Sequence, residues 1–475
     1  MHPDSCQGQN SFVLWYKSTA TPVIKLLHLS DIHLGSGLSH GKTNPDTGLN
    51  TRFEDFVRAL QQCIDRAIAE PVDLVLFGGD AFPDATPAPR VQEAFAQQFR
   101  RLSTAGIPAV LLVGNHDQHA QGQGGASLSI YRTLGVPGIV VGDRLETHCL
   151  ETTGGPVQVV TLPWLTRSTL LTRPETDGLS MGEVSHLLLD RLRVALEGEI
   201  RQLNPDQPAV LLAHVMVDTA EYGAERFLAV GKGFTVPTAL IARPCFDYVA
   251  LGHVHRHQIL CESPLMVYPG SIERVDFSEE HEPKGFVRVD LERGSAELEF
   301  CPLKVRQFCT IEADLCDAAD PLAALLQAIE GASIDEAVVR LRYRIRPVQL
   351  DAIDYATLQQ QLTRAHSYTI HPELASQMAT PRLPQLDDSH RLDPLEALNL
   401  YLEHRTDLAI ASADLRRAAQ GLVSPDTDGD WLDKSTASRT VNRQAGAQSE
   451  PRQCREDDGP TGFASDPHER QLRLL

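Results

Sequence analysis

The sequence lacks long apolar runs. Its longest apolar stretches, such as Val72–Phe77 and Ala109–Val113, are far shorter than the ~20 residues that span a bilayer. Residues 1–20 have neither a basic start nor an extended apolar stretch, so they do not resemble a secretory signal. We therefore expect a cytoplasmic protein that is not inserted in a membrane.

Paired cysteines are also lacking. The nine cysteines are scattered and form no C-x-x-C pair, which argues against a zinc ribbon and against a disulfide framework. Dispersed, odd-numbered cysteines are typical of a reducing compartment. The cysteine pattern therefore agrees with the cytoplasmic location expected from the apolar runs.

Positive charge is in deficit. The chain has 43 Lys and Arg against 63 Asp and Glu, a formal net charge of −20. Bulk positive charge therefore cannot hold nucleic acid here, because non-specific binding depends on neutralising phosphates with Lys and Arg. A site in which bound cations supply a local positive field is still compatible with this composition.

What the sequence does contain is an ordinary apolar fraction of 42% in 475 residues, typical of globular domains. From Val23 onward, strand-like runs alternate with helical spacing such as Phe53–Ala69, which predicts an α/β domain with a mixed or parallel sheet. The predicted organisation is a disordered extension (1–22), an α/β domain (23–302), a small α+β domain (303–375), a linker (376–392), a helical segment (393–421) and a disordered tail (422–475).

Polar residues follow five of the predicted strands, at the point where each strand ends. Any one of these short motifs alone is more often a turn, a helix cap or a surface pair. Ligands of open α/β sheets, however, bind outside the carboxyl ends of the strands. Five such ends therefore predict one shared site, formed by Asp31, His33, Asp80, Asn115, His116, Asp117, His214, His253 and His255.

The residue types of this site indicate its chemistry. Carboxylate and amide oxygens with imidazole nitrogens, and no thiolate, suit Mn²⁺, Fe²⁺ or Zn²⁺. The set is too large for one tetrahedral ion, but two ions roughly 3.5–4 Å apart that share one carboxylate would use it. Such a pair binds a phosphate and promotes in-line displacement, so the site predicts phosphoester hydrolysis.

The motifs resemble those of a known family. DIHLG, FGGD, VGNHD, LLAHV and LGHVH are similar to the five motifs of the calcineurin-like metallophosphoesterases. The longer segments HLSDIHLGS, VLLVGNHD, LGHVHRHQ and VYPGSIERVDFSEE are similar to the SbcD-type nuclease subunits within that superfamily. The resemblance covers about residues 23–300 in sequence and 300–420 only in layout. It implies a four-layer α/β metallophosphoesterase sandwich with a small α+β capping domain and a C-terminal helical segment.

The resemblance also implies a role for each site residue. Asp80 would bridge two metal ions, and His116 would act as proton donor or transition-state stabiliser, oriented by Asp117. Where part of the wider family has His or Asp three positions after the bridging Asp, this chain has Pro83, followed by Asp84, to which we assign no role. The remaining ligands would be Asp31, His33 and His255 for one ion and Asn115, His214 and His253 for the other.

A run of alternating arginines lies in the predicted α+β domain. Period 2 places all four on one face of a strand, where they form either a basic stripe for DNA phosphates or a charge-protected sheet edge. The resemblance to a capping domain favours the DNA interpretation slightly. The four residues are Arg340, Arg342, Arg344 and Arg346.

The segment 393–421 predicts two short helices beyond a linker. Its apolar face, with Leu398 and Tyr401, is expected to dock a partner as an amphipathic helix in a groove. Lys232–Gly233 does not have P-loop spacing, so any ATPase activity must come from that partner.

Together these features predict a metal-dependent DNA nuclease, exonuclease and endonuclease, with Mn²⁺ as the favoured ion. The resemblance implies action on DNA ends in repair, recombination and replication, as a homodimer joined to an SbcC-type coiled-coil ATPase. One alternative is a small-molecule phosphodiesterase or phosphoprotein phosphatase on the same scaffold. The other is a non-catalytic scaffold, which has no chemical need for the complete ligand set.

Overall fold

The computed structural model describes residues 23–119, 125–166, 176, 178–223, 235–375, 394–403 and 412–423. The expected extension at 1–22, the linker at 376–392 and almost all of the expected tail lie outside these residues. The chain forms two compact units. The first contains the residues up to Tyr343 and Asp351–Glu373, and the second contains Arg344–Leu350 and the described residues from Leu374 onward.

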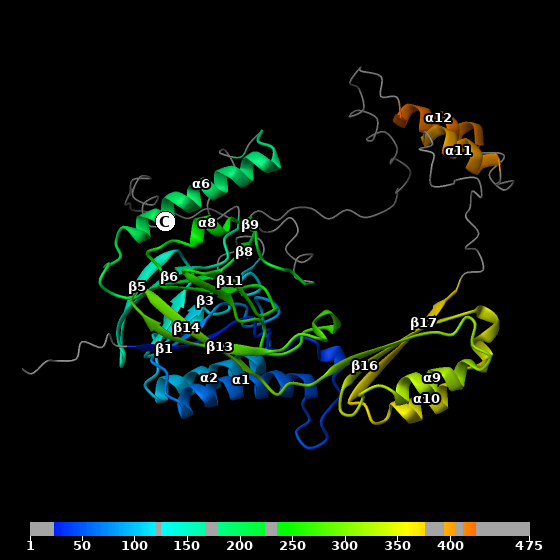
Figure 1. The fold of residues 1–475 in the computed structure, drawn as a ribbon, viewed down its shortest axis with the longest axis horizontal. Helices are drawn as coiled ribbons and strands as arrows, with labels where there is room; N and C mark the ends of the chain where they lie inside the picture. The colour runs from blue at the N-terminus through cyan, green and yellow to red at the C-terminus, as the bar shows by residue number, and fades with distance from the viewer. Residues whose placement is uncertain are drawn as a thin grey trace, which may run out of the picture. The chain divides into compact units, whose positions relative to one another are not determined.

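A first six-stranded sheet lies in the first unit, in the order β14-β13-β1-β2-β3-β4 (Figure 1). Strands β1 to β4 are parallel, and β13 and β14 extend the sheet in antiparallel fashion. Their bounds are β1 Ile24–Leu29, β2 Leu74–Phe77, β3 Ala109–Leu112, β4 Ile139–Gly142, β13 Gly285–Glu292 and β14 Ser295–Pro302.

A second six-stranded sheet has the order β11-β12-β10-β7-β6-β5. Its four inner strands are parallel, and the edge strands β5 and β11 are antiparallel to their neighbours. Their bounds are β5 Glu146–Thr152, β6 Gly155–Leu162, β7 Ala209–His214, β10 Tyr248–Gly252, β11 Gln258–Glu262 and β12 Leu265–Tyr268.

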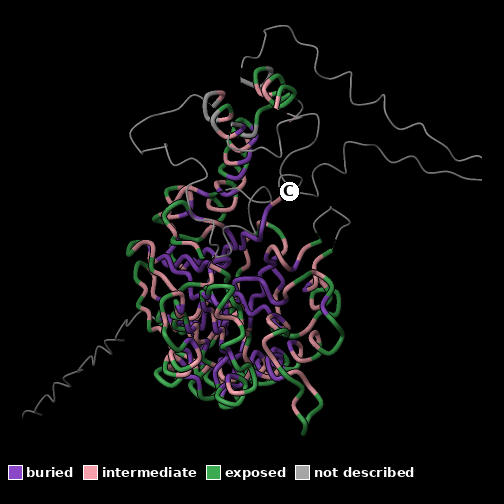
Figure 2. Tube along the Cα trace, turned by 90° about the vertical axis from the view of Figure 1, so that its right-hand side faces the viewer, coloured by how far each residue is buried: buried purple, intermediate pink, exposed green. Residues whose placement is uncertain are grey.

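The two sheets pack face to face. Leu26 and Leu76 of the first sheet share an apolar core with Val210 and Ala250 of the second, and buried residues are concentrated through this region (Figure 2). A parallel strand covered on both faces needs apolar side chains on both, which explains the continuous apolar runs in β2 and β3.

Helices cover the outer face of each sheet. Helices α1 (Thr51–Ala69) and α2 (Pro89–Thr104) pack on the first sheet, while α6 (Met181–Ile200) and α8 (Thr238–Ile241) lie on the other side of the pair (Figure 1). Local sequence starts them: the Asn50 side chain caps α1, and Ser180 with Glu183 forms a capping box at α6. The result is the predicted four-layer α/β sandwich.

A small α+β domain follows the sandwich. Its three strands have the order β15-β16-β17, and it contains helices α9 (Pro321–Glu330) and α10 (Tyr355–Leu362). The sequence predicts an α+β domain here and its central strand, which is β16 (Val338–Ile345). It did not indicate the flanking strands β15 (Phe308–Asp314) and β17 (Ser367–Leu374).

Polar contacts hold the small domain to the sandwich. Buried Asp55 of α1 accepts two hydrogen bonds from Arg306, at 2.6 and 2.9 Å. Thr51 Oγ1 lies 2.7 Å from His366 Nε2. These contacts join α1 to the segments that begin and end the small domain, so its first-unit residues are docked on the sandwich.

The second unit contains a pair of packed helices, α11 (Pro394–Glu403) and α12 (Ser412–Val423). Arg416 of α12 donates to the Asn399 side chain at 2.7 Å. On α11, Leu398 and Tyr401 are half-buried and Leu402 is buried. Among the described helices of both units, none combines the length and apolarity needed to cross a bilayer.

Candidate metal centre

The polar residues lie where the parallel strands of both sheets end. Asp31 and His33 follow β1, Asp80 follows β2, and His253 follows β10. All four have positive φ values, of 52°, 45°, 59° and 109° respectively. Non-glycine residues rarely adopt this conformation, and such strain is found where surrounding structure imposes it at functional sites.

A first group of ligand atoms belongs to Asp31, His33 and His255, all within 4.8 Å of one another. The Nε2 atoms of His33 and His255 are 3.0 Å apart. Asp80 Oδ2 lies 3.7 Å from His33 Nε2. This is the set that the sequence assigned to one ion.

A second group belongs to Asp80, His214 and His253. Asn115 Oδ1 lies 2.9 Å from His214 Nε2 and 2.9 Å from His253 Nδ1. Asp80 Oδ2 is 3.4 Å from His214 Nε2. The Asp80 carboxylate therefore lies between both groups, as a bridging ligand must.

The hydrogen bonds behind these ligands test whether a cation fits. His214 donates its Nδ1 proton to the Gly78 carbonyl at 2.7 Å, so Nε2 is the nitrogen that faces the Asp80 carboxylate and that would bind an ion after losing its proton. His255 donates its Nδ1 proton to Glu279 at 2.6 Å, so its Nε2 lone pair faces His33. Converging lone pairs and negative charge are stable in a buried site only with positive charge among them. This donor set fits two divalent ions.

The electrostatics of the site agree with this fit. Burial and the neighbouring His255 lower the pKa of His33 to about 3, which keeps it neutral and able to bind metal. Burial opposes ionisation of Asp80, but His214 and His33 outweigh it and hold its pKa well below the usual range. Burial also opposes protonation of His214, yet the Asp80 and Asp31 carboxylates raise its pKa to about 9. The pocket therefore attracts positive charge.

His116 lies beside both groups. Its ring is 5.0 Å from that of His33, and its nitrogen lies within 4.8 Å of ligand atoms of His33 and Asp80. Its Nδ1 donates to the Pro83 carbonyl at 2.8 Å. The other nitrogen, Nε2, is therefore the one left for substrate or ion.

Asp117 does not take the place that the sequence analysis expected. Its buried carboxylate accepts backbone N–H groups of Asp80, Ala81 and Gly114 at 2.9–3.1 Å, because buried N–H groups of two tight turns need acceptors. Within the described residues, the His116 ring is held instead by Pro83, at the position where part of the family has His or Asp. The Asp84 carboxylate accepts from the Thr86 N–H at 2.8 Å and from the Thr86 hydroxyl at 2.9 Å.

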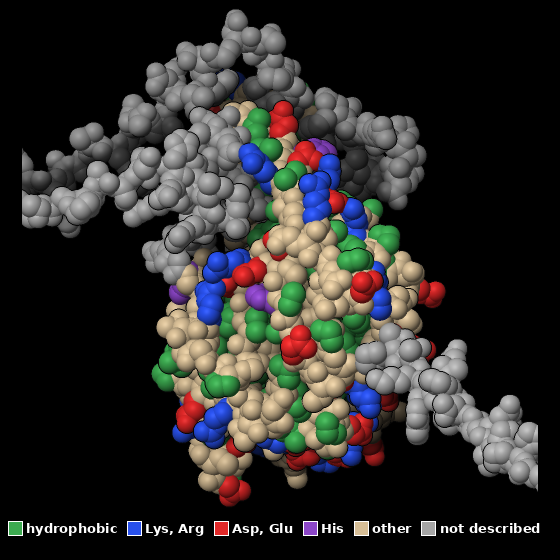
Figure 3. Space-filling view, turned by 90° about the vertical axis from the view of Figure 1, so that its left-hand side faces the viewer, with side chains coloured by type: hydrophobic (Ala, Val, Ile, Leu, Met, Phe, Trp, Pro, Cys, Tyr) green, Lys and Arg blue, Asp and Glu red, His purple; other side chains and the backbone are tan. Residues whose placement is uncertain are grey.

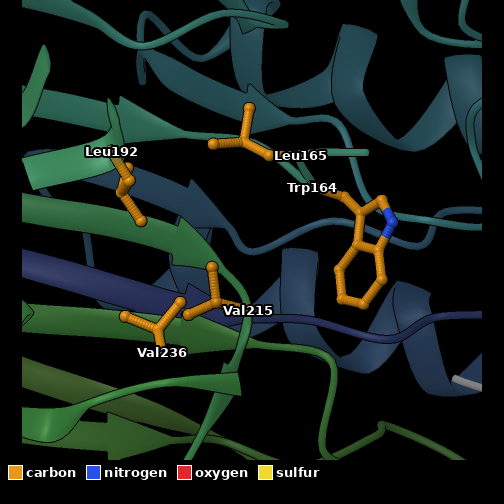
Figure 4. Close-up of a pocket in the computed structure, with 5 residues that line it drawn as sticks. All are labelled: Trp164, Leu165, Leu192, Val215 and Val236. Carbon is orange, nitrogen blue, oxygen red and sulfur yellow. The ribbon is translucent and has the colours of Figure 1, made fainter. Parts of the chain in front are cut away.

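Sequence reasoning missed three residues around the centre. Glu279 and Lys284 pair with each other at 2.8 Å; although burial disfavours a charged Glu279, His255 and Lys284 hold its pKa well below the usual range. The Trp164 ring stacks on His253, with centroids 4.9 Å apart. Trp164 also lines a small apolar pocket with Leu165, Leu192, Val215 and Val236 (Figure 4). None of the three has a recognisable ligand spacing in sequence.

Arg340, Arg342 and Arg344 lie on β16, and Arg346 comes directly after it. These arginines have protein partners. Arg340 lies over the Phe277 ring, 4.3 Å from its centroid. Arg342 pairs with Glu312 and Glu373 on the flanking strands, at 2.9 and 2.6 Å, and Arg344 and Arg346 also make contacts. Figure 3 views the side that lies at the left of Figure 1, and basic side chains are interspersed with acidic ones there. A DNA role for this stripe stays a prediction.

Comparison with known proteins gives one family and several similar folds. Residues 24–257 match the calcineurin-like phosphoesterase family. A protein from Thermus thermophilus is 17% identical, with 59% of this chain and all of that chain covered and a TM-score of 0.33. A dimetal phosphatase from Danio rerio is 12% identical (58% and 98% covered, TM-score 0.35). A purple acid phosphatase from yellow lupin is 14% identical (60% and 53% covered, TM-score 0.36).

Proposed function

Because residues 24–257 form a calcineurin-like phosphoesterase domain, which hydrolyses phosphoesters with two metal ions, we propose that this protein is a DNA nuclease acting at DNA ends. The observation that carries the hydrolytic part is the position of Asp80 between two groups of metal ligands. The DNA part is supported by the SbcD-like segments and by the small domain held next to the sandwich.

The chain's own residues divide the work as follows. Asp31, His33 and His255 hold one ion, Asn115, His214 and His253 hold the other, and Asp80 is shared. When bound, the two ions bind the phosphate and activate the attacking water. His116, held through Nδ1 by Pro83, directs Nε2 to the phosphate and donates a proton or hydrogen bond to the leaving oxygen.

The small domain favours a polymeric substrate. A small phosphoester needs only the centre at the strand ends, whereas a DNA duplex extends well beyond it. The Asp55–Arg306 contact ties this domain to α1 of the sandwich. In this proposal the stripe on β16 contacts DNA phosphates, which compete for Arg342 with Glu312 and Glu373.

The proposal includes the partners expected from the sequence. Helices α11 and α12 dock an SbcC-type coiled-coil ATPase, and two copies of the chain form a homodimer. The physiological ion is Mn²⁺, and the protein works in cytoplasmic DNA repair and recombination. Leu398 and Tyr401 lie on the docking face of α11.

A second candidate function is supported by one observation. The charge of Arg342 is balanced by two carboxylates, and the chain has a net charge of −20. A small-molecule phosphodiesterase or a phosphoprotein phosphatase on the same scaffold would need no basic surface. This alternative uses the same metal centre.

The deciding experiment is digestion of end-labelled linear DNA by the full chain with Mn²⁺, with and without the ATPase partner. Bis(p-nitrophenyl) phosphate and p-nitrophenyl phosphate serve as small diester and monoester substrates. We expect Mn²⁺-dependent shortening of DNA that Asp80→Asn abolishes. Hydrolysis of the small esters with intact DNA, in the presence of the partner, would favour the second candidate.

A further inference from the structure

Glu279 lies directly behind one of the metal ligands. It ends the short 3-10 turn Phe277–Glu279, which Asp276 caps by accepting from Ser278 N–H. Its carboxylate accepts the Nδ1 proton of His255 at 2.6 Å. Glu279 is buried, with 4% of its surface exposed, and it lies outside the family match at 24–257.

The two oxygens of Glu279 have separate partners. Oε1 accepts from His255, while Oε2 accepts from Lys284 Nζ at 2.8 Å and from Val275 N–H at 3.1 Å. Lys284 is itself buried and also donates to the His255 carbonyl at 3.1 Å and to Glu282 at 2.9 Å. Lys284 therefore holds both the carboxylate and the backbone of the ligand that the carboxylate orients.

We propose that Glu279 is a positioning residue for the metal ion held by Asp31, His33 and His255, and that Lys284 anchors it. The contact fixes His255 in the Nδ1–H tautomer, which leaves the lone pair on Nε2. The two nitrogens His255 Nε2 and His33 Nε2 are 3.0 Å apart, and both would be available to the ion. A carboxylate behind a ligating imidazole also raises the basicity of that ligand, and removing such a partner typically costs about 10–100-fold in metal affinity.

The Glu279–His255 contact supports a ligand of one ion and not a ligand of the other. His214, a ligand of the other ion, is oriented by the Gly78 carbonyl at 2.7 Å, a weaker neutral acceptor. Loss of Glu279 should therefore affect one ion and spare the other. The inference rests on the two-metal part of the proposed function and is independent of whether the substrate is DNA.

The test measures Mn²⁺ binding to the 475-residue chain without substrate. Calorimetry and the EPR signal of free Mn²⁺ are the two readouts. Glu279→Gln keeps the shape of the side chain but removes its charge, and Glu279→Ala removes the contact. Glu282→Gln is the matched control, because Glu282 is a second carboxylate that accepts from the same lysine, at 2.9 Å. Thermal unfolding of each variant reports on the fold.

We expect Glu279→Gln and Glu279→Ala to weaken one Mn²⁺ site by roughly 10–100-fold and leave the second unchanged. Glu282→Gln should bind two ions as the wild type does, and Glu279→Asp should recover part of the loss. Wild-type binding at both sites in Glu279→Ala would overturn the proposal. So would equal weakening by Glu279→Gln and Glu282→Gln, or loss of both sites together with the fold. Wild-type protein that binds both ions but does not cut DNA would instead contradict the nuclease proposal and leave this inference standing.

Discussion

At the scale of single residues, the centre depends on which side chain is shared. Asp80 lies 3.7 Å from His33 and 3.4 Å from His214, one ligand of each group. His33 belongs to the first group of ligands and not to the second. Substituting Asp80 therefore tests a ligand shared by both ions, and substituting His33 tests a ligand of one ion.

Asp80→Ala should remove both ions, whereas His33→Ala should weaken mainly one. Metal content after dialysis against Mn²⁺, measured with protein concentration on one preparation, checks this. Binding of substantially fewer than two ions by the wild type at saturating Mn²⁺ would contradict the two-metal assignment.

Metal affinity should depend on pH through His214. Its metal-free pKa is raised from 6.5 to about 9, so at pH 7 it is protonated and the ion must displace that proton. Affinity should therefore rise with pH, by up to about tenfold per unit between 7 and 8.5. Calorimetric Mn²⁺ titrations across this range measure it. A pH-independent affinity would show that His214 is neutral before the ion binds.

His116→Leu should separate binding from chemistry. The Nδ1 atom of His116 donates to the Pro83 carbonyl and is therefore not a metal ligand. A positioned general acid typically contributes ~10²–10⁴-fold in rate. We expect two ions and near-normal DNA affinity, with cleavage lowered by about that factor. Metal content and cleavage rate are measured side by side. Loss of an ion by this variant would make His116 a ligand instead.

At the scale of elements, strand ends and the turns after them shape the site. Asp117 acts here through the backbone, since its carboxylate accepts N–H groups from the turns after β2 and β3. Asp80 and Asn115 belong to these two turns, so the Asp117 hydrogen bonds help to fix their positions. Helix α11 is the other element with an assigned role, because its apolar face is proposed to bind the ATPase.

Replacing Leu398 and Tyr401 by Asp should abolish co-purification with the ATPase partner. Both side chains are half-buried on α11, so two charges there would have to be desolvated at the interface. Intrinsic nuclease activity should stay near the wild-type value, and Asp414→Asn on α12 serves as an exposed control. Full complex formation by the double variant would place the partner surface elsewhere.

At the scale of the whole molecule, the small domain and the sandwich meet through a buried carboxylate. Asp55 is 3% exposed and accepts from Arg306, Arg52 and Arg58. Arg306 belongs to the segment that leads into the small domain, and its side chain is largely buried. Arg58 also pairs with Asp55, at 3.2 Å, but its side chain is exposed.

Arg306→Ala should lower the free energy of unfolding by about 1.5–3 kcal/mol, the value of hydrogen bonds to a charged group. DNA cleavage should fall more than hydrolysis of bis(p-nitrophenyl) phosphate, because only DNA needs the small domain. Arg58→Ala is the matched control and should cost about 0–1 kcal/mol. Urea unfolding and the two activities are measured on each variant. An equal loss of DNA cleavage and of bis(p-nitrophenyl) phosphate hydrolysis would contradict a role of the small domain in DNA binding.

The residue patterns by themselves determined the α/β class and the location of the site, whereas the four layers were expected only from the family resemblance. Alternating strand and helix patterns specify which segments are buried on both faces. Polar residues lie at or just after the ends of β1, β2, β3, β7 and β10, and parallel strands of a sheet end at one edge. These are local properties of the chain. They also include helix starts such as Pro394, where proline suits the first helical turn.

Only the tertiary structure decided which groups hydrogen-bond to the site histidines and hold them in place. The pairing of His255 with Glu279 joins residues 24 positions apart, and that of His116 with Pro83 joins residues 33 apart through a backbone carbonyl. A carbonyl is the same in every residue, so no side-chain pattern can indicate it. The partners of Arg342 likewise come from β15 and β17, strands that the sequence did not predict. Such contacts depend on how distant segments pack, which spacing along one chain does not encode.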